Sequence, residues 1–253
     1  MSPQQAYVPV QLGPMRTKVA TWSRESGDEL FLFVHGLGCS KKSWRDAWSR
    51  PELREKSLLA VDLPGFGHSP LPDNFGCELE DHAGILAALV DAHASRKIHL
   101  VAHSMGGSVA VLLPERMLAR LKRLTLIEAR LVNSSCGLAS GSASVNFEKF
   151  KNETFPQFRK IARRDQRSAY DLDRVELEAF YRSARSLTRW ANSKELLHRF
   201  LRCPCPTSFV YGGVNTHLGE LTHIDAARKV SIADAGHFVM QDQPQALYHH
   251  LAS

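Results

Sequence analysis

The chain has 253 residues, of which 43% are hydrophobic and 23% are charged. This length and composition indicate one α/β domain with a full core, without low-complexity tracts or internal repeats. The first residues lack the pattern of a secretory signal, and no apolar run reaches the roughly 18 residues of a membrane span. Five scattered cysteines do not form a disulfide framework. We therefore expect a cytoplasmic protein without a membrane span.

The net charge of +6 is unevenly distributed along the chain. Residues 147–202 contain 14 Lys and Arg against 8 Asp and Glu, a surplus of 6. Such a surplus can attract an anionic small-molecule substrate, or it can be the solvated face of helices. The basic residues are not interleaved with exposed aromatic residues and match no nucleic-acid-binding module, so we expect no nucleic-acid partner.

The apolar runs predict the strands of a parallel sheet. The segments near residues 7–12 and 17–22 predict an edge hairpin. After it, six apolar runs of strand length follow at residues 30–34, 57–61, 98–102, 124–127, 207–211 and 229–233. Strands that are apolar on both faces are typical of parallel sheets covered by helices on both sides.

Helices are predicted between these strands. Residues 78–94 carry apolar side chains at helical spacing, and residues 108–119 and 243–251 also have a helical pattern. Strands that alternate with helices favour a doubly wound α/β fold.

One long interval contains no apolar strand. Residues 132–196 are first rich in Gly and Ser and then charged with helical spacing, and such a stretch is too long for a simple connection. We predict an inserted helical lid there, with residues 1–131 and 197–253 forming the core. Its aromatic residues are expected either to line the pocket or to pack the lid: Phe147, Phe150, Phe155, Phe158, Phe180, Tyr181 and Trp190.

Ser104 is the predicted nucleophile. It follows the strand at 98–102, and small residues stand two positions before and after it, at Ala102 and Gly106. This is the pattern of a nucleophile elbow, a sharp strand-to-helix turn that tolerates only small neighbours and exposes the serine oxygen above the sheet.

A serine needs a base to take its proton. His237 follows the last predicted strand in Ala235-Gly236-His237-Phe238, at the carboxyl edge of the sheet, where open α/β folds bind ligands. The order of serine before histidine is also the order that this kind of sheet uses. We therefore predict His237 as the general base.

An oxyanion hole requires backbone N–H groups that point at the developing negative charge. Met105 directly follows the predicted nucleophile at a helix start and should supply one. Leu37 lies in the loop after the strand at 30–34 and should supply the other. We expect Gly36 to let this backbone approach closely and His35 to brace the loop.

These motifs together resemble the α/β-hydrolase superfamily, in particular its lidded branch of esterases, carbon–carbon bond hydrolases and haloalkane dehalogenases. The matching segments are His35-Gly36, residues 62–69 (DLPGFGHS), residues 102–106 and residues 236–238. The resemblance implies a mostly parallel sheet of about eight strands and no metal or organic cofactor. A dehalogenase is disfavoured, because dehalogenases of this branch have an aspartate where this chain has Ser104.

The acid that should orient the histidine departs from the family pattern. In most relatives it lies three residues beyond the position of Gly212, where this chain has Asn215. Some dehalogenases instead place it 24 residues after the nucleophile, which is the spacing from Ser104 to Glu128 (128 − 104). We predict Glu128 as the acid. Asp234 and Asp225 are weaker candidates, and the remaining alternative is a degenerate triad.

Three functions agree with these residues. The first is hydrolysis of a carboxylic ester, thioester or lactone through an acyl-enzyme formed on Ser104. The second is hydrolysis of a carbon–carbon bond in a diketone-like substrate by the same residues. The third is a ligand receptor or binding scaffold without turnover, which Asn215 alone suggests.

Overall fold

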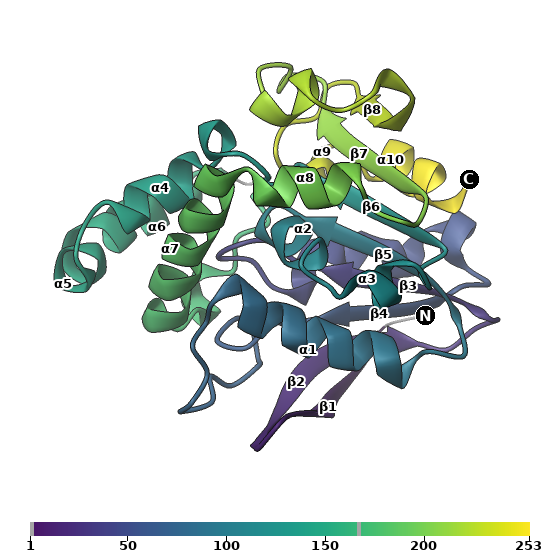
Figure 1. The fold of residues 1–253 in the computed structure, drawn as a ribbon, viewed down its shortest axis with the longest axis horizontal. Coiled ribbons are helices and arrows are strands. Elements are labelled where there is room, and N and C mark those ends of the chain that lie inside the picture. Colours follow the sequence, from purple (N-terminus) through teal and green to yellow (C-terminus); the bar gives the residue numbers. More distant parts are fainter. Residues whose placement is uncertain (1–2, 166–167) are drawn as a thin grey trace.

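A single eight-stranded sheet forms the centre of the molecule. The structure is a computed structural model that describes residues 3–165 and 168–253. The strand order is β1-β2-β4-β3-β5-β6-β7-β8, and every pairing from β4 to β8 is parallel (Figure 1). The strands are β1 (Gln4–Leu12), β2 (Met15–Arg24), β3 (Glu29–Val34), β4 (Ser57–Val61), β5 (Lys97–His103), β6 (Arg123–Ile127), β7 (Thr207–Gly212) and β8 (Lys229–Ile232). The predicted α/β fold with a mostly parallel sheet is confirmed.

The central strands are apolar throughout because both of their faces are buried. In β3, Leu30 and Leu32 belong to the core on one side of the sheet, whereas Phe31 and Phe33 belong to the core on the other. Alternate side chains of a strand point to opposite faces, so burial on both sides removes the polar alternation of an exposed strand. The hairpin of β1 and β2 is antiparallel and joins the sheet through β4.

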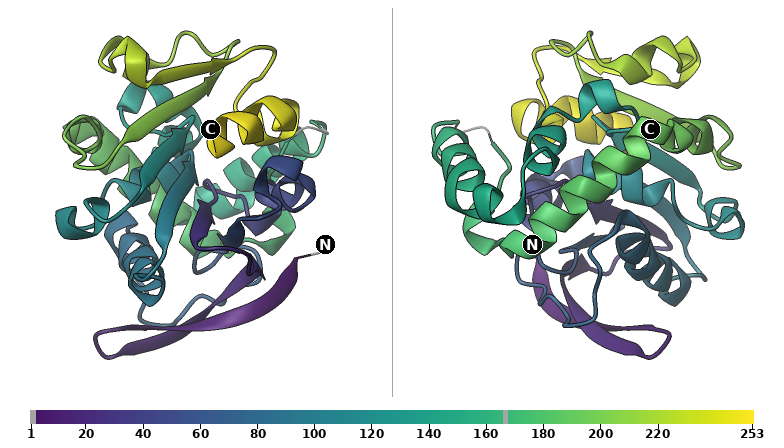
Figure 2. Two further views of the ribbon diagram at one scale, coloured as in Figure 1. Left: turned by 90° about the vertical axis from the view of Figure 1, so that its right-hand side faces the viewer. Right: turned by 60° about the vertical axis from the view of Figure 1, so that its left-hand side comes forward.

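Helices cover both faces of the sheet (Figure 2). One face packs against α1 (Leu79–Ala92), α2 (Met105–Ala110), α3 (Glu115–Leu118) and α8 (Glu195–Leu201), and the other against the 3₁₀ helix η1 (Lys41–Ser49), α9 (Val239–Asp242) and α10 (Pro244–Ala252). The expectation of one helix over residues 108–119 was wrong. The chain leaves the helical conformation before Pro114, whose ring disfavours helical backbone in the preceding residue.

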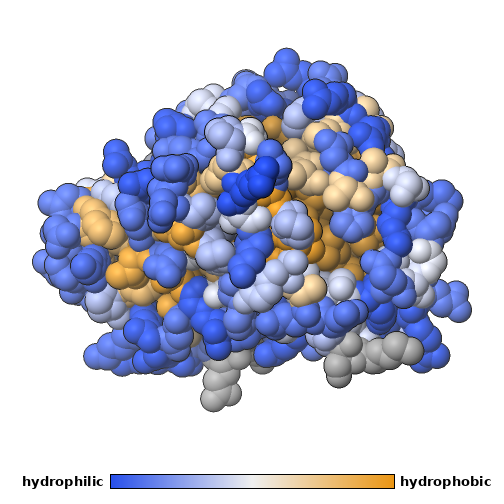
Figure 3. Space-filling model, turned by 90° about the horizontal axis from the view of Figure 1, so that it is seen from below, coloured by the Kyte–Doolittle hydropathy of each residue, from blue (hydrophilic) through white to orange (hydrophobic). Residues whose placement is uncertain are grey.

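The chain between β6 and β7 is helical, and its part before α8 lies beyond the carboxyl ends of the strands (Figure 1). It contains α4 (Gly137–Ala143), α5 (Phe147–Lys149), a π-helical turn (Phe150–Thr154), α6 (Phe155–Ala162), α7 (Leu177–Ser193) and α8. We call α4 to α7 the β6–β7 helices. Of the helices in residues 3–165 and 168–253, none combines the length and apolar character needed to cross a bilayer. Seen from below, the surface is mostly hydrophilic, with apolar side chains between the charged ones (Figure 3).

Candidate active site

Ser104 occupies a strained turn between β5 and α2. Its φ of 52° and ψ of −121° lie outside the ordinary regions for a non-glycine residue, and only 8% of its surface is exposed. Gly106 has no room for a side chain, because a Cβ there would lie 2.5 Å from the carbonyl oxygen of His35. The backbone at Ser104 therefore has the sharp bend that the sequence pattern predicts.

His237 lies in the loop between β8 and α9, and Ser104 and His237 line the same cavity. The His237 carbonyl oxygen accepts a hydrogen bond of 2.9 Å from Nε2 of His103, the residue before Ser104. This bond ties the loop that carries His237 to the end of β5. The cavity, which we call the Ser104 cavity, has a volume of about 210 Å³.

Glu128 directly follows β6 and is fully buried, with a φ of 49°. Its Oε1 accepts hydrogen bonds from the Gly212 amide (2.9 Å) and from Nδ2 of Asn215 (3.1 Å). Its Oε2 lies 3.3 Å from Nδ1 of His237. The residue that stands in the usual place of the acid, Asn215, thus contacts the carboxylate of Glu128.

The two weaker acid candidates are not paired with His237 in the described part of the chain. Within residues 3–165 and 168–253, neither Asp234 nor Asp225 forms a hydrogen bond or ion pair with His237, whereas Glu128 does. Asp234 has left β8 and has a φ of 55°.

The loop after β3 passes directly beside Ser104. A Cβ on Gly36 would lie 2.9 Å from Cβ of Ser104, so only glycine allows this approach. His35 accepts a 3.0 Å hydrogen bond at Nε2 from the Leu63 amide, and its Nδ1 donates to the Gly36 carbonyl at 2.8 Å. Because Nε2 accepts, the proton of the neutral ring must be on Nδ1.

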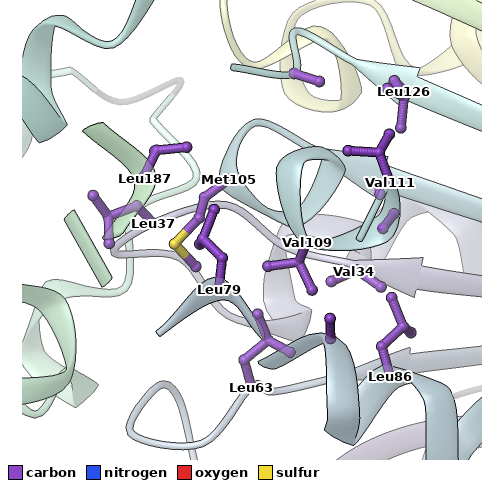
Figure 4. Packing of buried hydrophobic residues seen from close by; sticks show 14 of the residues in the cluster. Val34, Leu37, Leu63, Leu79, Leu86, Met105, Val109, Val111, Leu126 and Leu187 are labelled. Atoms are coloured by element: carbon purple, nitrogen blue, oxygen red, sulfur yellow. The ribbon is translucent and has the colours of Figure 1, made fainter. Parts of the chain in front are cut away.

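The two predicted oxyanion donors have free backbone amides. Among the residues that the structure describes, neither the Leu37 N–H nor the Met105 N–H donates a backbone hydrogen bond. Their side chains are buried together with Leu187 of α7 (Figure 4). Two unpaired N–H groups next to a cavity can accept an anionic oxygen without breaking an existing bond.

The walls of the Ser104 cavity differ from the expectation. None of the seven aromatic residues named above lines it; the lining residues are Leu37, Cys39, His103, Ser104, Arg130, Ser135, Cys136, Gly137, Leu138, Ala139, Tyr170, Leu187 and His237. The pocket-wall alternative for these aromatics was therefore wrong. Several of them pack on one another, as Phe150 does on Phe180 and Tyr181 at ring-centroid distances of 5.6 and 5.3 Å.

A backbone contact joins the residues after α6 to the loop after β3. Cys39 and Tyr170 form an isolated antiparallel bridge, and the Asp171 amide donates a 2.9 Å hydrogen bond to the Gly38 carbonyl. The same loop that carries Leu37 is thus held by the residues that close one side of the cavity.

Two charged residues near the site were not anticipated. Arg130 lines the cavity, and its Nη2 lies 2.8 Å from Nδ1 of His237. Glu220 is fully buried and accepts hydrogen bonds from the amides of Leu131 (2.8 Å) and Val132 (3.2 Å). Arg130 could have been found from its position, because it is a charged residue only two positions after the predicted acid Glu128. Glu220 gave no such signal, because its partners are about 88 residues away in the chain.

Burial keeps the imidazoles of the site neutral. Desolvation, and secondly the positive charge of Arg130, hold the pKa of His237 well below its ordinary value. Desolvation also holds the pKa of His103 well below its ordinary value. At neutral pH both rings are therefore uncharged, as a general base must be before it accepts a proton.

Comparison with known proteins shows the family of the chain. A family model described as the alpha/beta hydrolase family matches residues 31–250. The chain belongs to this family. In structure it is similar to an esterase from Thermogutta terrifontis, with a TM-score of 0.75, 21% identity, and coverage of 98% of this chain and 96% of that one.

Curated relatives match over shorter regions. The chain is similar to a putative esterase/lipase 2 from Mycoplasma pneumoniae, with 29% identity over 97 residues, which are 38% of this chain and 36% of that protein. It is also similar to the 2-hydroxy-6-oxo-2,4-heptadienoate hydrolase of Pseudomonas putida, with 32% identity over 101 residues, which are 39% of this chain and 36% of that protein. The matched part thus spans about a third of each of these relatives.

Proposed function

We propose that this protein is a serine hydrolase that cleaves a carboxylic ester, thioester or lactone through an acyl-enzyme on Ser104. The main support is one arrangement: a strained Ser104 shares a cavity with His237, and the buried Glu128 carboxylate lies 3.3 Å behind that histidine. A nucleophile, a base and an orienting acid in this relation perform acyl transfer on many folds.

In the proposed first half-reaction, Ser104 Oγ attacks the carbonyl carbon while Nε2 of His237 takes the hydroxyl proton. The amides of Leu37 and Met105 stabilise the oxyanion of the tetrahedral intermediate. As the intermediate collapses, the bond to the leaving group breaks and His237 returns the proton to that group. Acylated Ser104 remains.

In the second half-reaction, a water molecule gives a proton to His237 and attacks the acyl carbon. The bond to Ser104 Oγ then breaks, the serine regains the proton, and a carboxylic acid leaves. Throughout, Glu128 holds the proton on Nδ1 of His237 and stabilises the imidazolium that forms in each step. The proposed role of residues 132–196 is that of a cap, which closes the cavity and selects the acyl and leaving groups.

A second function with specific support is hydrolysis of a carbon–carbon bond. The similarity to the Pseudomonas putida hydrolase, at 32% identity, favours it. The alternative of a non-catalytic scaffold rested on Asn215 alone, and the hydrogen bond from Asn215 to Glu128 supports a catalytic site instead.

Labelling with a fluorophosphonate probe tests the proposal. We expect the folded wild-type protein to be labelled and Ser104→Ala to remain unlabelled. Ser135→Ala is the matched control, because Ser135 also lines the cavity and should leave the labelling intact. If wild-type protein with a native circular dichroism spectrum is not labelled, the proposed function is wrong.

A further inference from the structure

Arg130 is fixed at the cavity wall by its backbone. It follows β6 by three residues, and its carbonyl oxygen accepts a 2.6 Å hydrogen bond from Oγ of the buried Ser108. Its side chain is only 16% exposed. The guanidinium therefore lies mostly out of solvent, and its charge is little screened by water.

The hydrogen bond from Arg130 to His237 has a consequence for the proton on the imidazole. A guanidinium can only donate, so the bond of 2.8 Å from Nη2 requires a lone pair on Nδ1 of His237. The proton of the neutral ring is then on Nε2. That tautomer cannot take a proton from Ser104, because the nitrogen that must accept it already carries one, so without a ligand on Arg130 the enzyme reacts only through its less populated tautomer, with the proton on Nδ1.

Glu128 requires the opposite tautomer. A carboxylate only accepts, so the contact of 3.3 Å with Nδ1 of His237 is a hydrogen bond only when Nδ1 carries the proton. Arg130 and Glu128 therefore compete for one atom, and the shorter of the two contacts is the one to Arg130. Arg130 Nη1 lies 3.9 Å from Oε2 of Glu128, so the two charges also attract each other.

Arg130 has donors to spare for a ligand. A guanidinium carries five N–H donors, and within the described residues the only hydrogen bond it donates is the one to His237. Among the described residues that line the Ser104 cavity, it also has the only permanently charged side chain. An anion that enters the cavity would find these donors unoccupied, and a planar carboxylate can bind a guanidinium through two parallel bonds.

We propose that Arg130 binds a carboxylate of the substrate and, in doing so, releases Nδ1 of His237 to Glu128, so that carboxylate-bearing esters are turned over preferentially. This inference rests on the proposed serine hydrolase function. The tautomer change moves one proton from Nε2 to Nδ1 by exchange with solvent and alters no net charge. The bound carboxylate also offsets the positive charge of Arg130, which otherwise disfavours the imidazolium formed during catalysis.

The kinetic test uses matched substrates. One pair carries the charge on the leaving group, 4-acetoxybenzoate against its methyl ester, and the other carries it on the acyl group, monophenyl adipate against phenyl methyl adipate. The quantity measured is the ratio of kcat/KM for the anionic and neutral member, compared between variants, so that intrinsic reactivity cancels.

We expect Arg130→Gln to lower this ratio about 10- to 100-fold for at least one pair, the range of one charge-assisted hydrogen bond. The same variant should turn over the neutral esters faster than wild type, since Nδ1 is released. Arg164→Gln is the control, because Arg164 is exposed and outside the cavity lining. An unchanged ratio in Arg130→Gln for both pairs overturns the proposal.

A tautomer measurement does not depend on the variants folding. ¹⁵N NMR of wild-type protein should find the His237 proton on Nε2 without ligand and on Nδ1 after addition of 4-hydroxybenzoate, with sodium chloride as the ionic control. A proton on Nδ1 in the free protein, or no change with the acid, overturns the proposal. Fluorophosphonate labelling keeps the two hypotheses apart: without it the proposed function fails, and with it an unchanged ratio defeats only the role of Arg130.

Discussion

Replacing the Glu128 carboxylate with an amide tests the acid of the proposed triad. Glu128→Gln keeps the size and shape of the side chain. If the amide oxygen keeps its bonds to the Gly212 amide and to Asn215, the new NH₂ group faces Nδ1 of His237, 3.3 Å away in the wild type. An NH₂ group there favours the tautomer with its proton on Nε2, which cannot accept a proton from Ser104.

The expected loss is large. A wrong histidine tautomer in a triad of this kind lowers kcat by about 10³- to 10⁴-fold. The substitution also leaves Arg130 without its carboxylate partner at 3.9 Å and removes charge-assisted hydrogen bonds in a fully buried place. We therefore expect the free energy of unfolding to fall by about 1–3 kcal/mol.

The assay is the steady-state kcat on a short p-nitrophenyl ester, with urea unfolding followed in parallel. Asn215→Ala is the matched control, because it removes a neutral hydrogen bond to the same carboxylate and leaves the charge in place. It should lower kcat by no more than about 10-fold, the size of one ordinary hydrogen bond. Full activity in Glu128→Gln, together with a large loss in Asn215→Ala, would refute the assignment of the acid.

Three further outcomes follow from the structure. Gly36→Ala places a Cβ 2.9 Å from that of Ser104, so kcat should fall about 10²-fold; Gly141→Ala, whose Cβ meets open space outside the cavity lining, is the control, and equal kcat in both contradicts the expectation. Glu220→Gln weakens three hydrogen bonds to the chain after β6 and should lower the free energy of unfolding by about 1–3 kcal/mol in urea titrations; no change would count against it. Two lysines lower the pKa of Glu29 from 4.5 to about 2, so this carboxylate stabilises the fold above pH 4.5 and loses that effect as pH falls toward 2. Glu29→Gln should therefore cost about 1–2 kcal/mol at pH 7 in thermal unfolding and almost nothing near pH 2; a cost independent of pH excludes this reasoning.

Much of the fold was predictable because burial on both faces leaves a plain signal. The apolar run at residues 57–61 is β4 itself, and the run at 124–127 differs from β6 by one residue. A helix break depends on a single residue within an otherwise helical pattern of apolar side chains. The pattern over residues 108–119 therefore did not indicate the break before Pro114.

The predicted site residues follow strands, so the parallel topology alone brings them to one edge. Glu128 directly follows β6, and His237 lies in the loop after β8. Their contact could therefore be predicted without knowing how the helices pack. The cavity wall is different, because it depends on which face each of the β6–β7 helices turns toward Ser104. The stripe of aromatic residues shows that these helices pack tightly but not what they pack against, so the smaller Gly137 and Ala139 were missed as wall residues.

The backbone bridge between Cys39 and Tyr170 has a consequence for how this protein can change its substrate range. A substitution at Tyr170 that shifts its backbone also shifts the bridged loop that carries Leu37. Under the proposed mechanism, substitutions at Tyr170 would change substrate affinity and kcat together. Many variants that bind a new substrate more tightly would therefore turn it over more slowly. Residues 135–139 also line the cavity, but no isolated backbone bridge joins them to that loop in the described chain. Substitutions there can change the fit of a substrate without moving Leu37. Laboratory evolution toward new esters should therefore accumulate its first useful changes there.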